Sequence, residues 1–127
     1  MKKNIAIGLA LFTLFTLILS ACAIRDTAGG ASGPSVHMGG AAFIQSSITI
    51  KKGDSVTLID DAAVPHVITN GSWVSGQMQT KKEASAPAVS LNFTGNDSAT
   101  TPPFTTAGTY KLLCTIHSNM NLTVTVQ

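Results

Sequence analysis

The segment GTYKLLCTIHSNMNLTVTV, residues 108–126, decides the fold. Apolar residues alternate with polar ones at both of its ends: Tyr110, Leu112 and Cys114 in the first half, and Leu122, Val124 and Val126 in the second. A period of two is typical of a half-buried β-strand. The segment therefore predicts two strands joined by a loop, and a cysteine, a histidine and a methionine lie within seven residues at that loop.

The same alternation recurs upstream in residues 48–51, 55–58 and 89–93. Glycine, asparagine, aspartate and proline separate these runs, as in Gly95-Asn96-Asp97, and such residues are typical of turns. The sequence shows no convincing amphipathic helix, and residues 73–87 are compatible with irregular coil or with one short helical turn. Short strands with frequent turns predict an all-β domain, an antiparallel Greek-key sandwich or barrel.

The first residues are typical of an export signal. Lys2 and Lys3 precede an apolar run that is too short and wrongly flanked for a membrane span. The run ends in Leu19-Ser20-Ala21-Cys22, which resembles the bacterial lipobox, so we expect lipidation of Cys22. The alternative is an ordinary signal cut near this point, with an incidental cysteine.

The chain therefore divides into a lipoprotein signal peptide (1–21), a flexible tether of mainly small residues (22–35) and one domain (36–127). The full chain has eight Lys and Arg residues and six Asp and Glu residues, and two of the lysines belong to the signal. The mature chain thus carries balanced charge. This balance gives no indication of a nucleic-acid partner or of a polybasic membrane surface.

The loop of the C-terminal segment carries the chemistry, because Cys114, His117 and Met120 supply a thiolate, an imidazole and a thioether. Together with a second imidazole, these donors form the trigonal set with a weak axial methionine that suits copper in both oxidation states. The chain has only two cysteines, and lipidation of Cys22 would leave Cys114 without a disulfide partner. An exported lone thiol is a second indication of a metal.

Residues 43–66 and 107–126 resemble the two ends of plastocyanin-type cupredoxins. The first region ends in Pro65-His66, and the second contains Ala107-Gly108-Thr109-Tyr110 followed by Cys-x-x-His-x-x-Met. The two-residue gap between the last histidine and the methionine is similar to the short loop of amicyanins. The resemblance implies one type 1 copper with four ligands: His66, Cys114, His117 and Met120.

The chain departs from the cupredoxin pattern beside two of these ligands. Ile116 stands where the family usually has proline, and Val67 stands where an asparagine often ties the two ligand loops together. Because proline has no N–H, Ile116 restores a possible hydrogen-bond donor near the Cys114 sulfur. Such a bond favours Cu(I), so we expect Ile116 to raise the reduction potential relative to proline.

The resemblance implies an electron carrier, not an enzyme, whose redox partner proteins dock near His117. Val64, Pro65 and Ile116 would form an apolar rim suited to brief docking. We expect a monomer that is anchored to the membrane through Cys22 and faces the extracytoplasmic side. The alternative is a periplasmic copper chaperone or storage protein, and a visible spectrum of the copper-loaded protein separates the two.

Three further residues are expected to lie outside the metal site. His37 has no partner histidine or carboxylate at ligand spacing in the sequence, so we expect a histidine at the surface or at a strand end. Trp73 and Met78 are expected to be packing residues.

Overall fold

The computed structural model describes residues 33–127. The predicted signal peptide, the lipidation site Cys22 and most of the predicted tether lie outside the described residues. The first strand, β1, begins at Ser35, which is the last residue of the predicted tether. Across the described part of the chain, no helix has the length and apolar character needed to cross a membrane.

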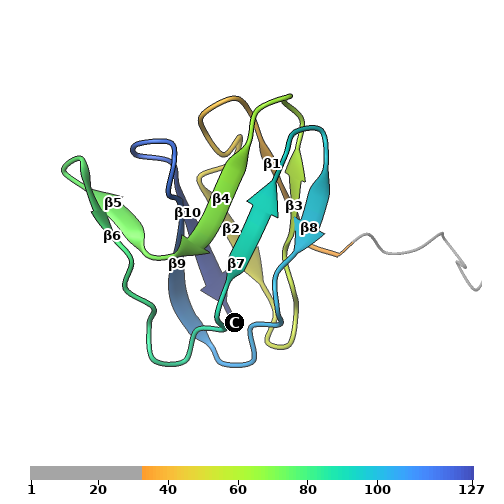
Figure 1. The fold of residues 1–127 in the computed structure, drawn as a ribbon. Coiled ribbons are helices and arrows are strands. Elements are labelled where there is room, and N and C mark those ends of the chain that lie inside the picture. Colours follow the sequence, from red (N-terminus) through yellow and green to blue (C-terminus); the bar gives the residue numbers. More distant parts are fainter. Residues whose placement is uncertain (1–32) are drawn as a thin grey trace, which may run out of the picture. The chain divides into compact units, whose positions relative to one another are not determined.

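Two sheets form the domain, and a separate hairpin projects from one side (Figure 1). The five-stranded sheet has the order β2-β10-β9-β4-β7, and the three-stranded sheet has the order β1-β3-β8. The strands are β1 (Ser35–Met38), β2 (Ser47–Ile50), β3 (Thr57–Asp60), β4 (His66–Asn70), β5 (Ser72–Val74), β6 (Gln77–Gln79), β7 (Ser90–Phe93), β8 (Ser98–Thr100), β9 (Gly108–Cys114) and β10 (Asn121–Val126). The predicted all-β sandwich is confirmed.

Two of the strand pairs are parallel, β1 with β3 and β2 with β10, and the other pairs are antiparallel. The predicted arrangement was an antiparallel Greek-key sandwich or barrel, which did not include these two parallel pairs. The physical reason for the difference is that side chains alternate in the same way in both kinds of pairing. The period of two therefore locates a strand and its buried face, but it does not reveal the direction of the neighbouring strand.

The core lies between the two sheets and contains the predicted apolar positions. β10 shows the pattern most clearly, because every second residue is buried along its whole length. The two sheets contribute these fully buried residues to the core: Val36, Met38, Leu58, Ile68, Leu112, Cys114, Leu122 and Val124. Leu113 is also fully buried, although the alternation of β9 does not predict it. It lies outside the main core cluster, on the strand that β5 contacts.

The β5–β6 hairpin corrects our expectation for residues 73–79, which was coil or a helical turn, whereas residues 80–87 form irregular coil and a turn, as expected. Its two turn residues, Ser75 and Gly76, have φ angles of 50° and 74°. Two successive positive φ angles are typical of a type I′ turn, which joins two strands tightly. All three residues of β6 are exposed, so no pattern of alternating burial marked the strand in the sequence.

The turn between β7 and β8 supports the loop that leads into His66. Gly95 has a φ of +109°, and a Cβ atom there would lie 2.8 Å from the Ala63 Cα atom and 2.9 Å from its carbonyl carbon. The next residue of the turn, Asn96, donates its backbone N–H to the Ala62 carbonyl oxygen at 2.9 Å. Backbone therefore packs directly on backbone at this point.

We predict that Gly95→Ala lowers the free energy of unfolding by about 2–4 kcal/mol, because an unfavourable φ adds to a steric clash. Gly53→Ala is the matched control: Gly53 has a φ of +91°, but a Cβ there meets no atom within 4 Å. We expect that variant to lose only about 1–2 kcal/mol. Urea titrations measure both values, and equal losses would show that the close packing of Gly95 on the 62–64 backbone does not matter.

Candidate metal centre

Strand pairing brings the first two donors together. Cys114 is the last residue of β9, and His66 is the first residue of β4. The two strands are antiparallel, with Cys114 opposite Ile68, so the start of β4 lies beside the end of β9. Both side chains are fully buried. The sheet thus joins residues that are 48 positions apart in the sequence.

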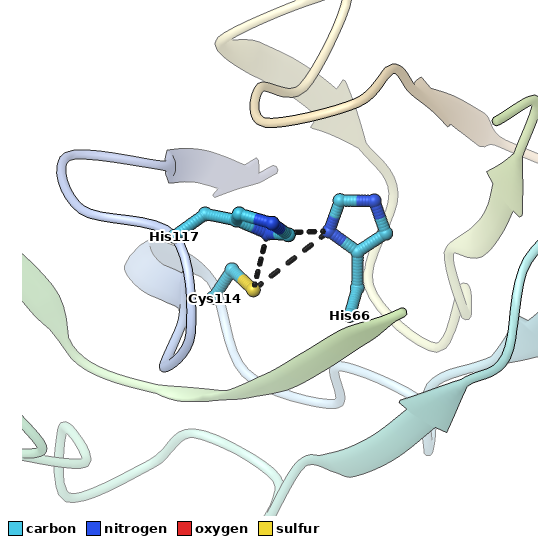
Figure 2. Close-up of side chains that lie close together, drawn as sticks. All are labelled: His66, Cys114 and His117. Atoms are coloured by element: carbon cyan, nitrogen blue, oxygen red, sulfur yellow. Dashed lines mark hydrogen bonds between the residues drawn. The ribbon is translucent and has the colours of Figure 1, made fainter. Parts of the chain in front are cut away.

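The third donor, His117, comes from the loop between β9 and β10, and the three side chains point toward one another (Figure 2). The Cys114 Sγ atom lies 3.5 Å from His117 Nδ1 and 3.8 Å from His66 Nδ1. The two Nδ1 atoms are 3.2 Å apart, and the rings are tilted by 57°. His66 is buried, whereas His117 is partly exposed.

These separations fit a single metal ion. A metal in a trigonal plane, with bonds of about 2.0–2.1 Å to nitrogen and about 2.3 Å to sulfur, keeps its donors about 3.5–3.8 Å apart. The observed separations run from 3.2 to 3.8 Å. Two imidazoles and one thiolate in this arrangement are the donor set that proteins use for type 1 copper. The residues present therefore fit copper without a large movement.

The ligand loop is closed by its own backbone. Cys114 N–H donates to the Met120 carbonyl oxygen at 3.0 Å, and Met120 N–H donates to the His117 carbonyl oxygen at 3.3 Å. Asn119 has a φ of 62°, which asparagine tolerates better than most residues. Met120 is 2 % exposed. Its thioether is thus held inside, in the loop that carries the other donors, and its role as the axial ligand remains a prediction.

Backbone atoms connect the two ligand segments at the positions where the chain departs from the family pattern. Thr115 N–H donates to the Val67 carbonyl oxygen at 2.9 Å, so Val67 ties the segments together without an asparagine side chain. Ile116 is 51 % exposed. Among residues 33–127, the hydrogen-bond contacts of the Cys114 sulfur are with the two histidine Nδ1 atoms. The structure therefore does not contain the hydrogen bond that we expected from Ile116.

Burial favours the neutral form of His66. Desolvation is the main cause that lowers the pKa of His66 below its ordinary value of 6.5; the nearby Asp60 carboxylate opposes it, and His117 adds to it. Metal binding requires a neutral imidazole. The buried ring is thus already in the protonation state that a metal needs near neutral pH.

Trp73 contacts the ligand loop, a role that the sequence analysis missed. Its indole Nε1–H donates to the Cys114 carbonyl oxygen at 2.8 Å. Its backbone N–H donates to Asn121 Oδ1 at 2.7 Å, and Asn121 Nδ2 donates back to its carbonyl oxygen at 3.0 Å. Cys114 and Asn121 flank the ligand loop, so Trp73 fastens both of its ends. Met78, the other expected packing residue, is 46 % exposed.

His37 lies in β1 and is not part of the three-residue donor group. It is a partly exposed strand residue, as expected, and its Nδ1 atom lies 2.7 Å from Asp61 Oδ2. The carboxylate partner was not visible in the sequence, because it lies 24 residues downstream. Within the described part of the chain, the three-residue donor group contains His66, Cys114 and His117 but not His37.

Comparisons with known proteins agree with this geometry. The family described as copper binding proteins, plastocyanin/azurin family, matches residues 33–127. A plastocyanin of Scenedesmus fuscus is 37 % identical over 95 residues, which cover 70 % of this chain and 90 % of that protein.

Solved structures show the same fold. Amicyanin from Paracoccus versutus (Thiobacillus versutus) aligns with a TM-score of 0.59 and 21 % identity, over 79 % of this chain and 86 % of that one. A reduced mutant of amicyanin aligns with a TM-score of 0.56 and 27 % identity, over 79 % and 88 % of the two chains.

We predict that Trp73→Phe weakens copper retention, because it leaves the Cys114 carbonyl oxygen without its indole donor. Loss of one hydrogen bond to a buried group costs about 1–3 kcal/mol of folding stability. Loss of a partner next to a metal ligand makes metal binding about 10–100-fold weaker. Competition with a copper chelator measures the second effect.

Tyr110→Phe is the matched control, because the Tyr110 hydroxyl also donates to a backbone carbonyl oxygen, that of Thr106, at 2.8 Å. We expect this variant to lose a similar amount of stability and to retain copper as the wild type does. Equal copper affinity in both variants would contradict a role of the Trp73 indole at the metal centre.

Proposed function

Because this chain belongs to the plastocyanin/azurin family of copper-binding proteins, the cupredoxins, we propose that it carries single electrons between membrane-associated redox partners. The observation that supports this proposal most directly is the group of two imidazoles and one thiolate at 3.2–3.8 Å. Such a set, with a distant thioether, binds one type 1 copper.

The residues of the chain hold the site ready for electron exchange. Copper, when bound, supplies the one-electron couple between Cu(I) and Cu(II). His66 and Cys114 sit on neighbouring strands, and the loop with His117 is closed by backbone hydrogen bonds. Donors that are fixed in this way move little when the charge of the metal changes, which favours fast electron transfer.

The enclosure of the site favours a carrier over the alternative of a copper chaperone or store. His66 and Cys114 have 0 % exposure, and Met120 has 2 %. A protein that passes copper to a partner needs donors that the partner can reach. Only His117 is partly exposed in the proposed ligand set.

Redox partners would dock around His117. The neighbouring Ile116 is 51 % exposed, Pro65 is exposed and Val64 is partly exposed. These uncharged side chains form a small apolar rim, and small interfaces permit rapid release. We propose that the protein acts there as a monomer.

The location is proposed from the N-terminal sequence alone. The tetrad that ends in Cys22 supports lipidation of that residue and anchoring to a membrane on its extracytoplasmic side. A lipid anchor would keep the carrier close to membrane-bound partners.

We predict that Cys114→Ser abolishes the intense visible colour of the copper-loaded protein, because the colour arises from charge transfer from the thiolate to Cu(II). His37→Ala is the control, since His37 lies outside the donor group, and it should keep the colour. Visible absorption of both variants after copper loading gives the answer. A Cys114→Ser protein with undiminished blue or green absorption would refute the assignment of the thiolate ligand.

We predict that Cys22→Ala moves the protein from the membrane fraction to the soluble fraction of a bacterial expression host. Two or more acyl chains give stable anchoring, whereas one chain binds only weakly. Immunoblots of the separated fractions measure the distribution. Equal recovery of the wild type and the variant in the soluble fraction would exclude the lipid anchor.

A further inference from the structure

A buried carboxylate lies behind the metal centre. Asp60 is the last residue of β3, and its side chain is fully buried. Its Oδ1 atom accepts the Ala62 backbone N–H at 3.0 Å, but its Oδ2 atom has no hydrogen-bond partner among the described residues. A buried carboxylate oxygen without a partner is costly, so a specific reason for its presence is expected.

The group that complements Asp60 is the far side of the His66 ring. His66 Nε2 lies 3.7 Å from Asp60 Oδ1, and it too is buried without a hydrogen-bond partner in residues 33–127. No lysine or arginine pairs with Asp60 in the described structure; the one basic side chain with a nitrogen within 4 Å of its carboxylate there is this ring. The unpartnered ring nitrogen thus faces a carboxylate oxygen, Oδ1, that already accepts one hydrogen bond, across a gap that is slightly longer than a hydrogen bond.

Metal binding on the near side of the ring defines the state of the far side. His66 Nδ1 is the atom that faces Cys114 Sγ and His117 Nδ1. A metal on Nδ1 leaves the proton of the neutral ring on Nε2, which then becomes a donor. A donor at this buried position needs an acceptor, and the negatively charged Asp60 carboxylate lies 3.7 Å away through its Oδ1 atom. The Gly39 backbone also interacts with His66 and competes for the same proton.

We propose that Asp60 is a positioning residue of the copper centre: it accepts the Nε2–H of His66, holds Nδ1 toward the metal and lowers the reduction potential. The proposal rests on the proposed copper site. A carboxylate behind a metal-bound histidine orients the ring and increases its basicity. Its buried negative charge also stabilises Cu(II) more than Cu(I), because the attraction is larger for the more highly charged ion.

The Asp60→Asn variant tests the proposal, because it preserves the size of the side chain and an acceptor oxygen but removes the charge. We expect the blue absorption to remain. At a fixed redox poise, the ratio of Cu(I) to Cu(II) should rise about tenfold. This corresponds to a reduction potential about 59 mV higher than that of the wild type, for a one-electron couple. Voltammetry measures this shift.

Asp61→Asn is the matched control. Asp61 carries the same charge one residue away, but it is exposed and pairs with His37 rather than with a ligand. We expect its potential to equal that of the wild type. A redox-independent measurement accompanies the potentials: Zn²⁺ should bind apo Asp60→Asn about tenfold or more weakly, and apo Asp61→Asn as tightly as the wild type.

Failure of this proposal is distinguishable from failure of the proposed function. A wild-type protein that develops no thiolate–copper colour refutes the copper site itself. A blue wild type with the same potential and Zn²⁺ affinity as Asp60→Asn refutes only the role of Asp60. A crystal structure of the wild-type Cu(I) form gives a check without any variant. An Nε2 atom that remains beyond about 3.5 Å from both Asp60 carboxylate oxygens would also overturn the proposal.

Discussion

The hydrogen bond from Cys114 N–H to the Met120 carbonyl oxygen is the constraint on which the metal centre depends. It continues the pairing of β9 with β10, in which Leu113 lies opposite Asn121, and it closes the ligand loop into a ring. The closed loop places His117 near the end of β9. His66, at the start of the neighbouring strand β4, lies near the same end. The sheet thus determines where the donors meet, and the closing bond determines how they face one another.

Much of this arrangement follows from the sequence, because the decisive signals are local. The alternation in β9 and β10 identifies two strands, and the short spacing from Cys114 to Met120 identifies the ligand loop. Asp60 also had a signal, since it shares the parity of Leu58 on the buried side of β3. A carboxylate at an apolar position of a strand is a candidate for a buried polar role, so this position alone marks Asp60.

The remaining features could not be predicted, because they depend on contacts between distant segments. Trp73 donates to the Cys114 carbonyl oxygen, which lies 41 residues away in the sequence. The acceptor is a backbone atom, which every residue has, so the pattern of side chains does not indicate it. The parallel pairing of β2 with β10 joins strands from opposite ends of the domain. The hairpin that carries Trp73 has an exposed second strand, β6. No alternation of buried and exposed residues therefore indicated that strand.

These contacts divide the control of the site between two groups of residues. Its shape is held by backbone hydrogen bonds, among them the bond from Thr115 N–H to the Val67 carbonyl oxygen, and by the Trp73 indole. Under our proposal, the charge beside the metal comes from the thiolate of Cys114 and, on the far side of His66, from the carboxylate of Asp60. The Asp60 carboxylate would also hold the His66 ring, so it would contribute to the shape of the site as well as to its charge. The reduction potential of the centre would then depend on a residue behind the ligands as well as on the proposed ligands.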